Sequence, residues 1–167
     1  MFNQIKVILI SFSSFLLSLP FTISGLSKFE KNEAKADWQP PGFVFGIVWP
    51  ILYYLLGALN LKLYYSNIDK EIKYKNLYLS IIESVLQTLW LSVTGNYNNG
   101  RSIFQNIFGL FILTFISYYT LKVRLPALYN LKDNYFYYYI PYCIWICFAL
   151  ILNFQIVKKN LINYGQY

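Results

Sequence analysis

Five long stretches without a charged residue dominate the chain, and short charged segments separate them. The stretches are residues 7–27, 38–61, 84–100, 102–121 and 134–157. Each is about as long as the roughly 20-residue helix that crosses the hydrocarbon core of a bilayer. A soluble helix or strand alternates polar and apolar residues so that one face stays hydrated, and these stretches do not. The pattern therefore predicts membrane-spanning helices.

The connections between the stretches are short, so neighbouring helices are expected to run antiparallel. We predict an all-α fold, an integral membrane bundle of five transmembrane helices in a single domain. A secretory signal is the alternative for the first stretch, because Lys6 precedes an apolar segment that ends near Pro20. The expected domain covers residues 1–167, with helices at about 5–26, 42–65, 76–95, 101–122 and 135–157.

The charged residues are few and flank the apolar stretches. They make up 13% of the chain, where an ordinary soluble domain carries roughly 25%, and the net charge is +7. A nucleic-acid-binding protein gathers its cations on one hydrated face, whereas cations beside apolar stretches anchor helices to lipid headgroups. We therefore expect a lipid bilayer as partner and no nucleic acid. The expected location is a bacterial cytoplasmic membrane or an organellar membrane.

The composition also limits the catalytic chemistry of the chain. It contains no His, which excludes Ser-His-Asp and Cys-His nucleophiles and histidine ligation of metal or haem. The two Cys residues, Cys143 and Cys147, lie four apart on one predicted helix and are interpreted as small packing residues. No catalytic residue, metal ligand or cofactor is predicted.

The second stretch opens with a distinctive motif, Trp38-Gln39-Pro40-Pro41, followed by Phe45 and Trp49. The two prolines stiffen the loop and pre-set the first helical turn, where a missing N–H costs nothing. Tyr53 follows Trp49 by four residues and shares its face. In order and spacing the segment resembles the W-x-P-P-x-x-x-F-x-x-x-W signature of the TspO/MBR family.

A second block, residues 141–153, agrees with this resemblance. It is similar to the family's P-Y-x-x-W-x-x-F-A-x-x-L-N fifth helix. Tyr142, Trp145, Ala149 and Asn153 recur every three or four residues and so form one helical stripe. Ala149 is small, which leaves room for a ligand or for a neighbouring helix.

The third helix departs from the family pattern. Glu83, Gln87, either Trp90 or Leu91, and Thr94 form a polar and aromatic stripe, and Gln87 stands where the family usually has Asn. An acid at the centre of a bilayer costs roughly 2.5–3.5 kcal/mol. Glu83 is therefore expected to face the bundle interior, to lie near an interface or to be protonated.

The resemblance implies a membrane receptor or carrier that binds porphyrins, and in some members sterols or synthetic aromatic drugs. A porphyrin is a flat aromatic plate with carboxylate arms, which suits Trp and Tyr faces with a cation at the mouth, here Lys35 or Arg101. The candidate ligand-binding residues are Trp38, Trp49, Tyr53, Gln87, Trp90, Tyr142, Trp145 and Ala149.

Other functions fit the same residues. Buried aromatic residues and amides also pack helices together, so the chain is alternatively a structural or assembly partner of other membrane proteins. A porphyrin-degrading membrane enzyme that uses the tryptophans is a further alternative. Gly42 and Gly46 form a G-x-x-x-G pair, which permits close helix contact in a homodimer.

Overall fold

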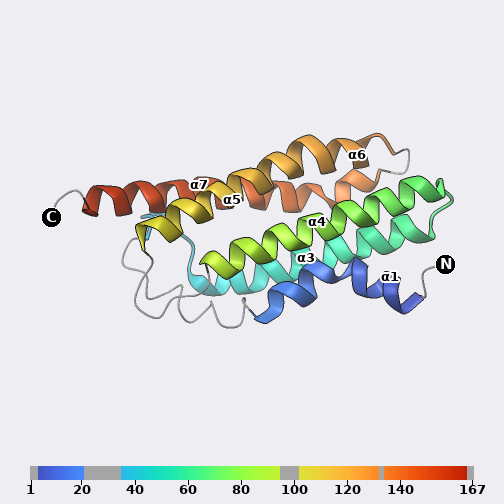
Figure 1. The fold of residues 1–167 in the computed structure, drawn as a ribbon, viewed down its shortest axis with the longest axis horizontal. Coiled ribbons are helices and arrows are strands. Elements are labelled where there is room, and N and C mark those ends of the chain that lie inside the picture. Colours follow the sequence, from blue (N-terminus) through green and yellow to red (C-terminus); the bar gives the residue numbers. More distant parts are fainter. Residues whose placement is uncertain (1–3, 21–34, 95–101, 132–133, 165–167) are drawn as a thin grey trace.

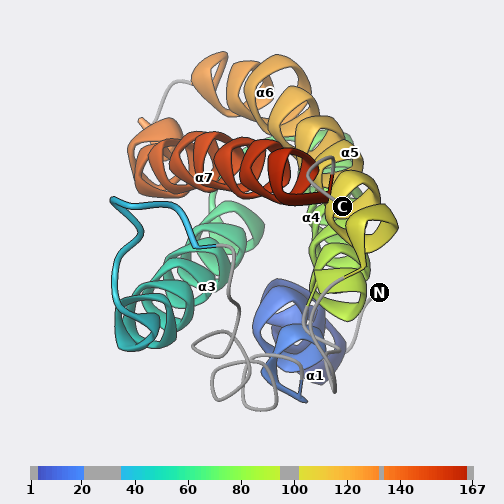
Figure 2. The same cartoon turned by 90° about the vertical axis from the view of Figure 1, so that its left-hand side faces the viewer.

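The protein is an elongated bundle of long helices, seen here in a computed structural model (Figure 1). The structure describes residues 4–20, 35–94, 102–131 and 134–164. Within these ranges the fold is all-α and contains no strand. Viewed end-on, α3, α4, α5 and α7 surround a common interior, and α1 lies beside α3 and α4 (Figure 2).

The helical elements follow the predicted order. Residues 13–20 are also helical and continue from α1 after a turn at Phe12. A π-helical turn, η1, and a 3₁₀ turn, η2, interrupt the α-helices. The elements are α1 (Gln4–Ser11), α3 (Gly42–Tyr65), α4 (Lys70–Thr94), α5 (Ile103–Tyr119), η1 (Thr120–Arg124), α6 (Leu125–Tyr129), η2 (Tyr135–Tyr138) and α7 (Ile140–Tyr164).

Four of the described helical segments are long and apolar enough to cross a membrane. They are Gly42–Tyr65, Lys70–Thr94, Ile103–Tyr129 and Ile140–Asn163. Large apolar side chains cover their outer faces: Phe104 is 79% exposed and Phe111 is 69% exposed. Water would penalise such a surface, whereas lipid tails solvate it, so the exposed residues agree with a membrane protein.

The helix bounds confirm some predictions and correct others. The predicted 42–65 helix matches α3, whereas α4 begins at Lys70 rather than near residue 76, and α7 continues to Tyr164 rather than ending near residue 157. The first predicted helix is described only to residue 20, and residues 21–26 lie outside the described ranges. The described part of this segment, residues 4–20, is not among the four candidate spans.

The largest correction concerns the end of α5. A loop was predicted after residue 122, but helical structure continues through η1 and α6 to Tyr129. A π-turn inserts an extra residue into the helical repeat and so changes which side chains face inward. Arg124, expected in a loop, is instead 1% exposed and lies inside the bundle.

Arg124 is the centre of a buried polar network. Its Nη1 donates to Asn76 Oδ1 at 2.6 Å, and its Nη2 donates to Asn60 Oδ1 at 2.9 Å and to Ser80 Oγ at 2.8 Å. Its Nε lies 3.9 Å from Glu83 Oε2. Glu83 is 2% exposed and therefore faces the bundle interior, which is one of the alternatives expected from the sequence. The two opposite charges leave the network without net charge, which reduces the cost of burying it.

The first helical segment packs closely on α3. The ring of Phe12 occupies the space that a side chain at Gly57 would need. Asn60 Nδ2 also donates to the carbonyl of Ser11 at 3.3 Å, and Ser14 Oγ lies 2.7 Å from Ser84 Oγ. These contacts join the segment to both α3 and α4.

The buried ion pair generates a stability prediction. Arg124→Met should lower the free energy of unfolding by about 3–5 kcal/mol, because it leaves the Glu83 carboxylate buried without its counter-charge. Unfolding of the detergent-solubilised protein by SDS measures the change. Lys122→Met is the matched control, because Lys122 is exposed two residues away. Equal stability of the two variants would show that the Arg124 network contributes little.

Candidate ligand site

Six aromatic rings from three helices form a continuous cluster inside the bundle. Trp49 of α3 is its centre: its ring centroid lies 5.4 Å from that of Tyr53, 6.1 Å from that of Trp90 and 6.2 Å from that of Trp145. The aromatic cluster consists of Phe45, Trp49, Tyr53, Trp90, Trp145 and Phe148. The Tyr53 ring stacks on Trp49, and the Trp145 ring meets it edge-on. The rings therefore offer both faces and edges to a flat partner.

The aromatic cluster continues toward the loop before α3. Trp145 stacks on Phe148 at 5.0 Å, and Phe148 in turn lies 5.7 Å from the ring of Trp38. Trp38 is 42% exposed, whereas Trp49 is 6% exposed. The rings thus form a path from the end of the bundle to its interior.

A polar wall borders the aromatic cluster on the side of α4 and α7. Gln87 Nε2 donates to the hydroxyl of Tyr142, and both side chains are 1% exposed. Three buried polar atoms here have no hydrogen-bond partner among the described residues: Gln87 Oε1, Trp90 Nε1 and Trp145 Nε1. A buried polar atom without a hydrogen-bond partner is costly. The acceptor and the two donors are therefore suited to form hydrogen bonds with a ligand.

The structure brings most of the predicted site residues together. Trp49, Tyr53, Trp90 and Trp145 belong to the aromatic cluster. Ala149 is 3% exposed and packs in the same hydrophobic core. Trp38 stands apart on the loop and touches the cluster through Phe148. Their contact with a ligand stays a prediction.

Sequence analysis missed two members of the aromatic cluster, Phe45 and Phe148. Both lie in the two motifs, one turn before Trp49 and three residues after Trp145. The sequence shows the spacing of these two residues within the motifs. It does not show which face of each helix points into the bundle, because that depends on how α3 and α7 pack. Phe45 lies 5.5 Å from Trp145 and so joins the two motifs directly.

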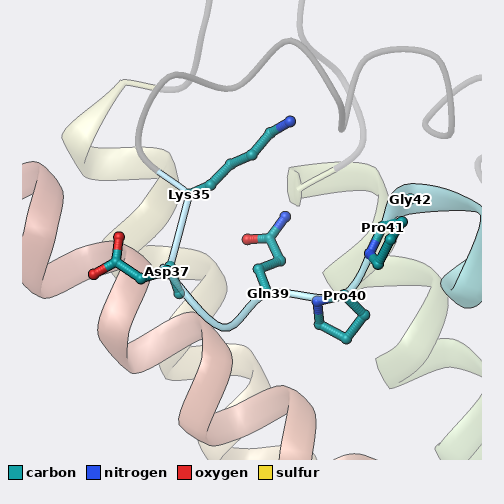
Figure 3. A pocket seen from close by; sticks show the side chains of 7 residues that line it. Lys35, Asp37, Gln39, Pro40, Pro41 and Gly42 are labelled. Carbon is teal, nitrogen blue, oxygen red and sulfur yellow. The ribbon is translucent and has the colours of Figure 1, made fainter.

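A pocket of about 510 Å³ lies at the end of the bundle where α3 begins (Figure 3). Lys35, Asp37, Gln39, Pro40, Pro41 and Gly42 surround it, together with Ala36. Gly42, which lines the pocket, lies one helical turn before Phe45 of the aromatic cluster. Lys35 is the predicted cation at this mouth, and Arg101 lies outside the described residues. The described residues contain no group of His, Cys, Asp or Glu that could hold a metal ion.

Two side chains of α7 hold the loop in place. Gln155 Oε1 accepts from the indole N–H of Trp38 at 2.8 Å. Lys159 Nζ donates to Asp37 Oδ1 at 2.8 Å and to the carbonyl of Lys35 at 3.0 Å. The hydrogen bond and charge of Lys159 lower the pKa of the exposed Asp37 carboxyl below its ordinary value. The loop is therefore tied to α7 beside the pocket.

Comparison with known proteins agrees with the motifs. The model of the TspO/MBR family matches residues 7–158. The tryptophan-rich protein TspO of Chlorobaculum tepidum is 27% identical over 143 residues, which cover 84% of each chain. The tryptophan-rich protein TspO of Bacillus cereus is 27% identical over 132 residues, which cover 75% of this chain and 76% of the relative.

The loop contacts predict a local change in hydrogen exchange. Lys159→Gln should speed exchange of the backbone amides in residues 35–39, because it removes the ammonium that binds Asp37 and the Lys35 carbonyl. Mass spectrometry of the corresponding peptides measures the rates, with Lys158→Gln as the neighbouring control. The lowered pKa keeps Asp37 ionised at both pH 7 and pH 5, so the ratio of the variant's exchange rates to those of the wild type should be the same at the two pH values. Identical exchange in both variants would contradict the tie.

Proposed function

Because the chain belongs to the TspO/MBR family, we propose that it is a membrane receptor or carrier that binds tetrapyrroles and related flat hydrophobic ligands, sterols among them, at its aromatic cluster. Membership of the family supports the receptor or carrier role, and the residues of this chain support the ligand class. The single observation behind the ligand class is the cluster of six rings with unpartnered polar atoms at its edge.

The ligand chemistry follows from the contents of the aromatic cluster. A porphyrin is wide, planar and aromatic, and gains from offset or edge contacts with indole rings. Its ring nitrogens provide both donors and acceptors, which complement an amide oxygen and indole N–H groups. The chain has no His to bind the iron of haem, so the metal-free macrocycle suits it better.

The polar ends of a porphyrin have a place at the mouth. The pocket beside the loop holds Lys35, whose ammonium can pair with a carboxylate. The ligand plate would then lie between Trp38 and Trp49, with its acidic edge in the pocket. Rings of the aromatic cluster now touch one another, so they must separate to admit a plate, as side chains of a carrier do when cargo enters.

Substitution of the central tryptophans tests the proposal. Trp49→Ala and Trp145→Ala should each weaken protoporphyrin binding roughly tenfold, since loss of an aromatic contact costs about 0.5–1.5 kcal/mol in addition to the lost burial. The affinity is measured by titrating the detergent-purified protein and recording porphyrin fluorescence. This readout does not depend on tryptophan emission, which the substitutions themselves change. Tyr54→Ala is the control, because Tyr54 is 63% exposed on α3. Wild-type affinity in both tryptophan variants would place the ligand elsewhere.

The number of spans is also a proposal. Residues 4–20 would be about 25 Å long as a continuous helix, close to the thickness of the hydrocarbon core, and they pack on α3 and α4. The described ends of the chain lie at opposite ends of the bundle (Figure 1). We therefore propose five transmembrane helices, with the segment that contains α1 as the first.

Five spans place the two termini on opposite sides of the membrane. In a background with Cys143→Ala and Cys147→Ala, single cysteines introduced at Asn3 and Gln166 should react with a membrane-impermeant maleimide from opposite sides of sealed vesicles. Labelling before and after permeabilisation measures the sidedness. Termini that react from the same side would require an even number of spans.

A further inference from the structure

The loop before α3 carries two opposite charges that point in different directions. A hydrogen bond from the backbone N–H of Gln39 to the carbonyl of Ala36, at 3.0 Å, closes a turn in this loop. Lys35, Asp37 and Gln39 all line the pocket. The side chains of Lys35 and Gln39 extend to one side of the loop, whereas the Asp37 carboxylate points to the other side, toward α7 (Figure 3). The turn thus separates the cation of the loop from its anion.

Lys159 of α7 holds the Asp37 carboxylate in this orientation. Its ammonium donates to Asp37 Oδ1 at 2.8 Å and to the carbonyl of Lys35 at 3.0 Å. One cation therefore binds both the anion of the loop and the backbone of the residue that brings a cation to the pocket. The pair of Asp37 and Lys159 has no net charge, so Lys35 provides the net charge of these three residues.

Without Lys159, the Asp37 carboxylate would face the Lys35 ammonium as its neighbouring opposite charge. The two residues are two apart in the sequence, so their Cα atoms lie within about 7 Å of each other. Opposite charges at such a distance attract each other even in water. Loss of the Lys159 charge would therefore leave the charge of Lys35 balanced by Asp37.

The loop has further anchors on α7 that do not depend on charge. Ala36 is 6% exposed and packs against Leu152 and Ile156. The indole N–H of Trp38 donates to Gln155 Oε1 at 2.8 Å. Removal of the ion pair would consequently change the charge of the loop more than its position.

A buried polar atom marks the pocket as a place for a polar group. Gln39 Oε1 is buried and has no hydrogen-bond partner among the described residues, which is costly unless an occupant satisfies it. The same amide carries an NH₂ group that donates, and rotation of the amide exchanges its two ends. A carboxyl group beside Lys35 can therefore bind to the Gln39 amide as well as to the ammonium.

We propose that Lys159 is a positioning residue that binds Asp37 away from Lys35, so that the pocket selects flat ligands with an anionic arm. This inference rests on the proposed function, because it places the acidic edge of the ligand in the pocket. It adds that the preference for an acid depends on a residue of α7 that is not among those that surround the pocket. Lys159 acts on the ligand only through the carboxylate that it neutralises.

Protoporphyrin and its dimethyl ester test this selection, because they share one macrocycle and the ester has no ionisable arm. Each is titrated into the protein in the same nonionic detergent, and porphyrin fluorescence gives its affinity. The acid-to-ester affinity ratio is compared between variants, so that partition into micelles, which is the same for all, cancels. Lys35→Gln sets the ratio without the cation. The wild-type ratio should be about fivefold higher, the upper range for an exposed ion pair.

Substitutions at Lys159 and Asp37 separate the proposed role from general loosening of the loop. Lys159→Gln should lower the ratio to within about twofold of the Lys35→Gln value. The double variant Asp37→Asn with Lys159→Gln should restore the wild-type ratio, because it also removes the carboxylate that Lys159 holds. Lys158→Gln removes one positive charge from the neighbouring position of α7 and should keep the wild-type ratio. A loosened loop would weaken binding in the double variant as well.

A wild-type ratio in Lys159→Gln would overturn the inference. So would a double variant that fails to restore the ratio, because Lys159 would then act by touching the ligand or by fixing the loop backbone. Equal ratios in wild-type protein and Lys35→Gln would also overturn it, because the acidic arm would then lie elsewhere. The proposed function survives these outcomes as long as both porphyrins bind saturably. Absence of saturable binding to wild-type protein would instead overturn the proposed function, and this inference with it.

Discussion

A guanidinium buried inside a membrane bundle is the constraint on which the rest of this structure depends. Arg124 carries a positive charge, and the surrounding lipid offers no water to solvate it. Asn60, Asn76, Ser80 and Glu83 must therefore converge on it from α3 and α4. The π-turn at the end of α5 supplies the change in register that turns Arg124 inward. One charge thus fixes how three helices meet.

The bundle has two halves with different chemistry. The Arg124 network occupies the half where α3 ends and α4 begins, and the aromatic cluster occupies the half where α3 begins. Polar groups in the first half are largely satisfied by one another, which favours a single rigid arrangement. The second half keeps unpartnered donors and an acceptor among its rings, which favours binding. The hydrogen bond from Gln87 to Tyr142 lies between the two halves.

Sequence alone predicted the elements that depend on local chemistry. The α3 helix was correct from end to end, because Pro40 and Pro41 mark its start and Ser66 follows its last apolar turn. The start of α4 was missed, because the charged residues Lys70, Glu71 and Lys73 were assigned to the connection that precedes the helix. Charged side chains are compatible with a helix end that reaches the membrane surface.

The candidate site was predictable to the same extent. Helical spacing placed Trp49 with Tyr53 and Trp145 with Ala149, but the contact between the two stripes depends on how α3 and α7 cross. Arg124 was assigned to a loop because its partners lie far away in the sequence, and no local pattern signals a π-turn. Glu83 was recognised as costly, yet the residue that compensates its charge was visible only in the fold.

Photochemical cross-linking tests the location of the ligand most directly. A porphyrin with a diazirine on the edge of its macrocycle is bound to the purified protein and illuminated, and the labelled peptides are sequenced. Binding at the aromatic cluster predicts labels on the inward faces of α3, α4 and α7, close to Trp49, Trp90 and Trp145. Labels confined to lipid-facing residues such as Phe104 and Phe111 of α5 would contradict a ligand site inside the bundle.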